Sequence, residues 1–183
     1  IVSSQNRNKY EKWVTAVFQD FSLLALSVGN NISASNEYDE LKVWDSIEKV
    51  GLKEKVEKYP KKLEQSLFKD YDDEGVDLSG GEAQKIAIAR GIYRDASLFI
   101  LDEPTAALDP YAEYAIFTKM NEISQDKTTI FISHRLYSCK FCDKVIVMDN
   151  GEIVQVGTHD ELVNVTGKYS EMWNAQAQHY VKK

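Results

Sequence analysis

Cysteine is scarce in this sequence, and long apolar runs are missing from it. There are 2 cysteines among 183 residues, too few for a framework of disulfide bonds, which favours a reducing compartment. The uninterrupted apolar runs, such as Leu98–Leu101, have the length of a β-strand and fall far short of a membrane span. No basic segment followed by an apolar one opens the chain. We therefore expect neither a membrane-spanning helix nor a secretion signal within these residues.

Basic residues are also scarce relative to acidic residues. The chain has 22 Lys and Arg against 29 Asp and Glu, which gives a formal net charge of −7. A protein whose main task is to grip nucleic acid needs a basic surface, so the charge balance argues against that class. With 43% hydrophobic and 28% charged residues, the composition is that of a globular domain. The first residue is Ile1 rather than Met, so we expect the 183 residues to be a piece of something longer.

What the sequence does contain is an alternation of strand and helix patterns. Short runs of β-branched, aromatic or aliphatic residues predict strands at 13–18, 98–101, 128–132, 145–148 and 152–156. Helical spacing predicts helices at 39–50, 83–93 and 109–123, and a last one near Leu162. Such an alternation predicts an α/β fold with a largely parallel sheet. The stretch from about Gly29 to Tyr71 is mainly helical and polar, and looks inserted.

The most distinctive local sequence is Leu78-Ser79-Gly80-Gly81-Glu82, at the head of a predicted helix. Ser79 and Glu82 have the spacing of a capping box, in which each side chain bonds to the backbone N–H of the other residue. The two glycines leave backbone N–H groups uncovered at the positive end of the helix, which favours an anion such as phosphate. An ordinary well-capped helix explains the same residues, because the motif is short.

Two adjacent carboxylates, Asp102 and Glu103, follow the predicted strand Leu98–Leu101. In open α/β sheets, ligands bind at the carboxyl ends of the strands. Paired acids there suit phosphoryl transfer, because one can hold Mg²⁺ and the other can polarise the attacking water. A strand that ends in a polar turn before Pro104 is the alternative interpretation.

Two more polar residues follow predicted strands. His134 comes after the strand at 128–132, and Gln19 comes after the strand at 13–18. In a parallel sheet, both would lie at the edge that carries Asp102. A single residue of either kind is more often structural than catalytic, so neither is informative alone.

Taken in order, these motifs resemble those of the ATP-binding cassette (ABC) ATPase family. Gln19 matches the Q-loop, Leu78–Glu82 resembles the signature, and Leu98–Glu103 resembles the Walker B motif. Ala107-Leu108-Asp109 resembles the D-loop, and His134 matches the H-loop. The resemblance covers nearly the whole chain. It implies a P-loop NTPase-like ABC ATPase core, a mostly parallel sheet flanked by helices, with an inserted helical subdomain that carries the signature.

The resemblance also implies a division of the chain and a subfamily. Residues 1–28 and 92–183 would form the C-terminal part of the ATPase core, and residues 29–91 the helical signature subdomain. The stretches from Phe18 to Ile32 and from Val147 to Leu162 are similar to those of exporter cassettes.

Roles for individual residues follow from the family's architecture, in which two cassettes pair head to tail around two ATP molecules. The resemblance implies that Asp102 holds Mg²⁺, that Glu103 is the general base, and that His134 binds the γ-phosphate. Gln19 would contact Mg²⁺ and water and sense the transmembrane domains. The residues expected at the ATP of the opposite cassette or at the dimer seam are Ser79, Gly80, Gly81, Glu82 and Asp109. Glu82 stands where the family more often has Gln.

The cofactors implied by the resemblance are ATP and Mg²⁺. The implied partners are a second cassette, identical or different, and transmembrane domains, which we expect in the same polypeptide; no nucleic acid is implied. The implied activity is ATP hydrolysis coupled to export, at the cytoplasmic face of the cell membrane.

One family motif is missing from the sequence. The chain contains no G-x-x-x-x-G-K-[ST], the P-loop that cradles phosphates; its only Gly-Lys pair, Gly167-Lys168, is followed by Tyr169. In the family the P-loop precedes the Q-loop, so we expect it upstream of Ile1, together with the N-terminal antiparallel β portion. We therefore expect the 183-residue chain alone to bind ATP negligibly and to hydrolyse none.

Non-transport members of the family are the alternative, and so is a non-catalytic cassette kept for dimerisation. Chromosome-organising members place a long coiled coil between the Q-loop and the signature, whereas Gln19 and Leu78 are 59 positions apart without sustained heptads. Translation-associated members favour an Asn-His-Leu-Asp D-loop, which this chain lacks. A degenerate cassette would usually have lost Glu103, His134 or a signature glycine, and all are present. Whether a P-loop lies upstream distinguishes a catalytic cassette from a non-catalytic one.

Overall fold

The computed structural model describes residues 12–123 and 127–181. The chain divides into two compact units, Ile1–Ile132 and Ser133–Lys183, and each is described by itself. In the described ranges, no helix combines the length and the apolar character that crossing a membrane requires.

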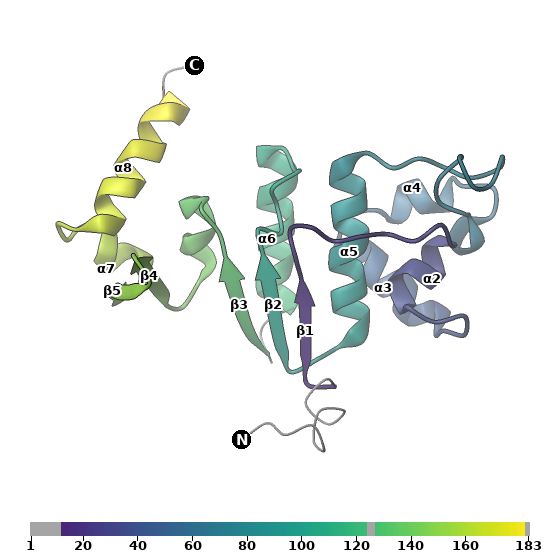
Figure 1. Cartoon of the computed structure of the whole chain (residues 1–183), viewed down its shortest axis with the longest axis horizontal. Coiled ribbons are helices and arrows are strands. Elements are labelled where there is room, and N and C mark those ends of the chain that lie inside the picture. Colours follow the sequence, from purple (N-terminus) through teal and green to yellow (C-terminus); the bar gives the residue numbers. More distant parts are fainter. Residues whose placement is uncertain (1–11, 124–126, 182–183) are drawn as a thin grey trace. The chain divides into compact units, whose positions relative to one another are not determined.

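The first unit is built on a parallel three-stranded sheet. Its strands are β1 (Val14–Val17), β2 (Leu98–Asp102) and β3 (Thr128–Ile132), in the order β1-β2-β3 (Figure 1). Val17 lies opposite Leu101, and Asp102 lies opposite Ile132. The carboxyl ends of the three strands therefore meet at one edge of the sheet. The predicted strands and the parallel sheet are confirmed.

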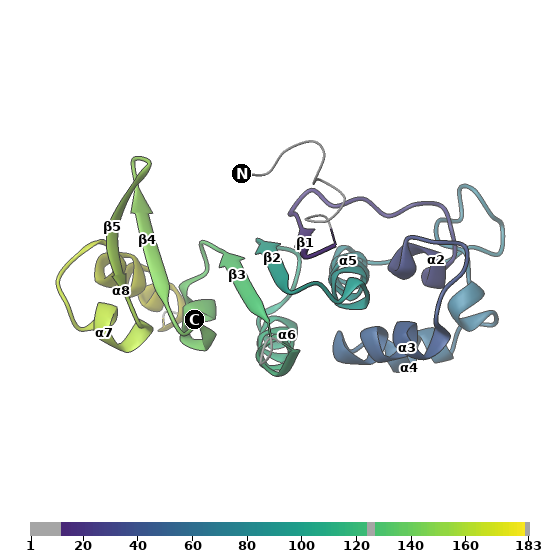
Figure 2. The same cartoon turned by 90° about the horizontal axis from the view of Figure 1, so that it is seen from below.

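Two long helices, α5 (Gly80–Arg94) and α6 (Pro110–Ile123), lie along the same face of this sheet (Figure 2). Helix α5 approaches so closely at Gly91 that a Cβ there would lie 2.7 Å from the Phe99 ring. On α6, the ring of Phe117 packs edge-on against that of Phe131, with centroids 5.5 Å apart. The buried core of the unit lies between these helices and the sheet.

Short helices fill the segment between β1 and α5: α2 (Val28–Ser33), α3 (Glu40–Lys49), α4 (Lys53–Glu57) and the 3₁₀-helix η2 (Lys62–Glu64). Of these, α2 and α3 pack against α5 and bury the side chains of Ile32 and Ile47 completely. The stretch from about Gly29 to Tyr71 is therefore mainly helical, as predicted. It is not only polar, however, because Val56, Leu63 and Leu67 are buried in the same core.

The second unit contains the 3₁₀-helix η3 (Leu136–Phe141), strands β4 (Val145–Asp149) and β5 (Glu152–Gly157), and helices α7 (His159–Val163) and α8 (Lys168–Val181). Strands β4 and β5, which correspond to the strands predicted at 145–148 and 152–156, form an antiparallel hairpin. Asn150 and Gly151 both have positive φ, 49° and 81°, as a two-residue type I′ turn requires. A small core around Leu136, Val147 and Tyr169 holds the unit together.

Candidate functional site

The predicted capping box forms at the N-terminus of α5. The Ser79 hydroxyl accepts the backbone N–H of Glu82 at 3.3 Å, and the Glu82 carboxylate accepts the backbone N–H of Ser79 at 2.9 Å. Ser79 and Gly80 are exposed. The N–H groups of the first helical turn have no partner within the helix itself, and the dipole adds partial positive charge there. The exposed tip of α5 is thus suited to an anion.

The Glu82 carboxylate also reaches α4. Its Oε1 lies 2.5 Å from the ammonium of Lys55, 27 positions away in sequence. Partial burial alone would raise the pKa of Glu82, but the hydrogen bonds from Lys55 and Ser79 hold it below its ordinary value. The Glu82 carboxylate therefore stabilises the N-terminus of α5, in addition to any contact that it makes with a ligand.

The glycines of the signature lie against the expected D-loop of the same chain. A Cβ on Gly81 would lie 3.1 Å from Leu108 Cδ2 and 3.2 Å from the carbonyl oxygen of Ala107. At Gly80 the nearest atom would be the Cβ of Ala107, at 3.8 Å. Gly81 is therefore at a close approach between two segments, whereas Gly80 has room.

The carboxylates stand at the carboxyl edge of the sheet, as predicted. Asp102 ends β2, and Glu103 follows it with a φ of 47°, a left-handed conformation that residues other than glycine seldom adopt. The backbone N–H of Glu103 donates to the carbonyl of Ile132 at 2.9 Å. Val17, the last residue of β1, is in register with Leu101, and Gln19 follows Val17 by two residues. Gln19 is exposed, and both acids are partly exposed.

The loop after Glu103 is tied to α6. Thr105, which is buried, donates its hydroxyl to the carboxylate of buried Glu113 at 2.8 Å. The Asp109 carboxylate accepts the N–H groups of Tyr111 and Ala112 at 2.9 and 3.0 Å, as the cap of α6. These bonds, led by that from Ala112, lower the pKa of Asp109. The exposed residue Asp109 thus caps the start of α6, the helix predicted at 109–123.

His134 follows β3 by two residues and belongs to the second unit. Its side chain is exposed. Its backbone carbonyl accepts the side-chain amide of Gln176 at 2.5 Å, and the carbonyl of that amide accepts the N–H of Leu136 at 3.0 Å. Gln176, on α8, therefore fixes the backbone around His134.

The oxygen donors at the sheet edge suit Mg²⁺, which takes one or two carboxylates and fills its other positions with water and substrate phosphates. Asp102, Glu103 and Gln19 supply carboxylate and amide oxygens there. Within the ranges that the structure describes, no three His, Cys, Asp or Glu side chains gather closely enough to form a metal site by themselves.

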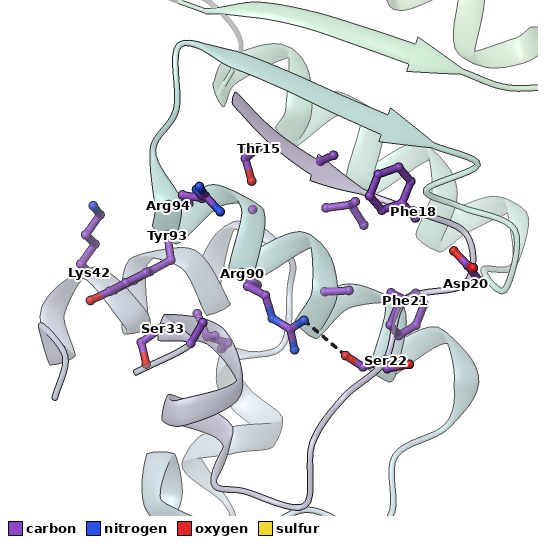
Figure 3. Close-up of a pocket in the computed structure, with 16 residues that line it drawn as sticks. Thr15, Phe18, Asp20, Phe21, Ser22, Ser33, Lys42, Arg90, Tyr93 and Arg94 are labelled. Atoms are coloured by element: carbon purple, nitrogen blue, oxygen red, sulfur yellow. Dashed lines mark hydrogen bonds between the residues drawn. The ribbon is translucent and has the colours of Figure 1, made fainter. Parts of the chain in front are cut away.

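The first unit has a groove of about 660 Å³, lined among others by Phe18 and Asp20 (Figure 3). Its lining residues come from β1 and the segment that follows β1, and from helices α2, α3 and α5. The cations along it are Lys42, Arg90 and Arg94, against one carboxylate, Asp20. The guanidinium of Arg90 donates to the carbonyls of Asn31 at 2.7 Å and Ser22 at 3.3 Å.

Aromatic side chains add apolar surface to this groove. Phe18 is 56% exposed, and Phe21 and Tyr93 also line it. The ammonium of Lys42 lies over the ring of Tyr93, 5.0 Å from its centroid. The groove is thus basic and aromatic, and its wall includes both neighbours of Gln19.

The sequence interpretation missed three residues that hold the site: Lys55, Gln84 and Gln176. One signal existed for Gln84. It stands four residues before Ile88 and seven before Gly91, so it falls on the buried face of the helix, where a polar side chain needs partners. Nothing in the local sequence marks Lys55 or Gln176, because their contacts are made at long range.

Comparison with known proteins agrees with these motifs. The family described as "ABC transporter" matches residues 2–106. The subtilin transport ATP-binding protein SpaT of Bacillus subtilis is 37% identical, over 93% of this chain and 28% of that protein. The ATP-dependent lipid A-core flippase of Paraburkholderia xenovorans is 36% identical, over 90% of this chain and 27% of that protein.

A solved structure of a bacterial Atm1-family ABC exporter with ATP bound superposes with a TM-score of 0.84. It is 28% identical in sequence, and the match covers 93% of this chain and 30% of that chain. The chain spans less than a third of the length of these relatives. Because the family match extends over more than half of the 183 residues, the chain belongs to the ABC transporter family and has the ABC ATPase fold.

Proposed function

We propose that this chain is part of the ATP-binding and ATP-hydrolysing domain of an ABC exporter. One observation carries the proposal: the anion-binding tip of α5 packs, at Gly81, on the loop that leads from the two carboxylates of β2 to Asp109. A phosphate-binding element and a candidate acid–base pair are thus part of one packed assembly. Residues 29–91 form its helical subdomain, and residues 1–28 and 92–183 belong to its core.

In this proposal Glu103 is the general base. Its carboxylate accepts a proton from the attacking water, while Asp102 and Gln19 provide oxygens for Mg²⁺, which neutralises phosphate charge when bound. His134 donates a hydrogen bond to the γ-phosphate. The geometry of Glu103 supports its role, since hydrogen bonds to Ile132 and from the Gln84 amide hold the backbone on both sides of its Cα.

The signature serves a second cassette. The tip of α5 is exposed, and no P-loop is found in the 183 residues. We propose that Ser79, Gly80, Gly81 and Glu82 contact the ATP held by a partner cassette, identical or different, with Asp109 at the seam. The P-loop that holds this chain's own ATP would come from a segment outside the 183 residues.

The transmembrane partner binds at the groove of Figure 3. Three observations support this location: a basic rim, exposed aromatic surface, and a wall that includes Phe18 and Asp20 on either side of Gln19. A partner segment in this groove would contact the backbone around Gln19 and could report on the ATP site. In this proposal the domain lies at the cytoplasmic face of the cell membrane, and the transmembrane domains belong to the same polypeptide.

The test is Glu103→Gln in the complete transporter, since glutamine keeps the shape but cannot accept the proton. We expect kcat to fall by about 10²- to 10⁴-fold while the ATP dissociation constant changes little. Glu54→Gln, at an exposed position on α4, is the matched control and should leave both constants unchanged. Turnover by Glu103→Gln at the wild-type rate would refute the assignment of the base.

A further inference from the structure

The side-chain amide of Gln84 lies between two points of the loop that follows β2. Its Nε2 donates to the carbonyl of Glu103 at 3.1 Å, and its Oε1 accepts the backbone N–H of Ala107 at 3.0 Å. The side chain is 2% exposed. Both ends of the amide are therefore used, on two residues four positions apart in the loop.

Glu103 needs such support because of its backbone conformation. A φ of 47° is sparsely populated for residues with a side chain, and persists only where the surroundings hold it. Within the loop, the N–H of Ala106 donates to the carbonyl of Glu103 at 3.2 Å. The bond from Gln84 reaches the same carbonyl from a separate helix. It therefore fixes the peptide plane after Glu103 relative to α5.

The contact made by Gln84 is connected to the signature through helix α5. Gln84 lies on the second turn of α5, five residues after Ser79, so one rigid helix joins the signature to the amide. At the same helix end, Gly81 packs against Leu108 in the loop. The tip of α5 is therefore connected to the backbone of Glu103 and Ala107 through Gln84.

We propose, on the basis of the proposed function, that Gln84 is the positioning residue that orients Glu103 and the D-loop backbone. Through α5 it joins the segment that meets the ATP of the partner cassette to the base that acts on the chain's own ATP. Gln84 itself touches neither substrate nor Mg²⁺. Its loss should therefore lower kcat and leave ATP binding nearly intact.

The experiment compares three variants in the complete transporter. Gln84→Leu removes both hydrogen bonds. Gln84→Glu keeps an acceptor for the N–H of Ala107, but in its ionised form it cannot donate to Glu103. Gln65→Leu is the control, because Gln65 is also 2% exposed and its amide donates to a backbone carbonyl, that of Glu74 at 2.6 Å, away from the carboxylates.

We expect kcat per folded molecule to fall by about tenfold or more in Gln84→Leu, since small misplacements of a reacting group are costly. The KM for ATP should stay within about threefold of the wild-type value. Gln65→Leu should lose thermal stability but keep its kcat. The activity of Gln84→Glu, relative to wild type, should rise as the pH is lowered, because a protonated carboxyl regains the donor. Equal kcat in Gln84→Leu and Gln65→Leu would overturn the proposal.

A second readout separates this inference from the proposed function. The backbone amide of Ala107 should exchange its hydrogen faster in Gln84→Leu than in wild type, and stay protected in Gln84→Glu. If the wild-type protein hydrolysed no ATP, the proposed function would fail. The exchange data would then still show whether Gln84 holds the backbone of Ala107. Unchanged exchange of Ala107 in Gln84→Leu would refute the positioning role of Gln84.

Discussion

Gly81 lies so close to Leu108 that a Cβ on the glycine would come within 3.1 Å of the leucine Cδ2. The tip of α5 and the D-loop of one chain are therefore in direct contact. The same Cβ would lie 3.2 Å from the carbonyl oxygen of Ala107, which is part of the backbone and yields less easily than a side chain. A side chain at position 81 would therefore have to displace the backbone of this loop.

We predict that Gly81→Ala lowers the free energy of unfolding by about 1 kcal/mol, because the added methyl overpacks this contact. Gly80→Ala has room, with its nearest neighbour at 3.8 Å, and should be neutral or slightly stabilising, since alanine favours a helix. Urea unfolding of the two variants measures the difference. Equal stabilities would show that the contact does not constrain Gly81.

The ion pair of Lys55 and Glu82 predicts a dependence of stability on pH. The folded-state pKa of Glu82 is depressed, so its contribution to stability is present above the unfolded value of about 4.3. It is lost as the pH falls through the lower folded value. The difference in unfolding free energy between wild type and Glu82→Gln should therefore shrink as the pH falls below about 4.3.

Lys55→Met provides the control for this pH effect. In that background the partner charge is gone, so the pH dependence of the Glu82→Gln difference should be weaker, as a double-mutant cycle would record. A pH dependence of the same size in both backgrounds would show that Lys55 is not its cause.

The predicted strands and most of the predicted helices agree with the structure because local signals determine them. The prediction that the last helix lies near Leu162 was wrong, because α7 (His159–Val163) is followed by the longer helix α8 (Lys168–Val181). The capping box at Ser79, the Asp-Pro start of α6 and the Asn150-Gly151 turn each act within a few residues. Glu103 and His134 could be placed after strands for the same reason. The division of the chain before Ser133 could not be inferred, since it depends on contacts across the whole sequence.

The support of the site could not be predicted in the same way. The partners of Gln84 and Lys55 are 19 to 27 positions away, and that of Gln176 is 42 positions away. Such pairs depend on how helices pack, which a single sequence does not specify. The contribution of Lys55 to the lowered pKa of Glu82 could not be predicted from the sequence, because Lys55 lies on another helix.

The groove of Figure 3 makes a prediction about coupling. Arg94→Glu reverses a charge on its basic rim, and Phe21→Ala removes part of its aromatic lining. Each variant should reduce transport more than it reduces ATP hydrolysis, because the contact with the transmembrane partner is weakened while the carboxylates are untouched. Measuring both rates in lipid vesicles gives the ratio. An unchanged ratio in both variants would place the docking surface elsewhere.

The 183-residue chain by itself should show no ATP turnover. It contains no G-x-x-x-x-G-K-[ST] sequence, so the main grip on the phosphates is absent, and its carboxylates have no substrate to act on. A phosphate-release assay with ATP and Mg²⁺ measures this directly. Turnover above background by the purified chain would refute the prediction.

In the proposed dimer, Glu103 acts on the ATP of its own cassette while Gly81 acts on that of the partner. Joining two copies of the complete cassette and distributing two changes between them, Glu103→Gln and Gly81→Asp, tests this directly. With the changes in separate copies, one composite site keeps both residues, so we predict up to half of the wild-type ATP hydrolysis. With both changes in one copy, each site loses one residue, and we predict none. Activity only when both changes share one copy would contradict the account.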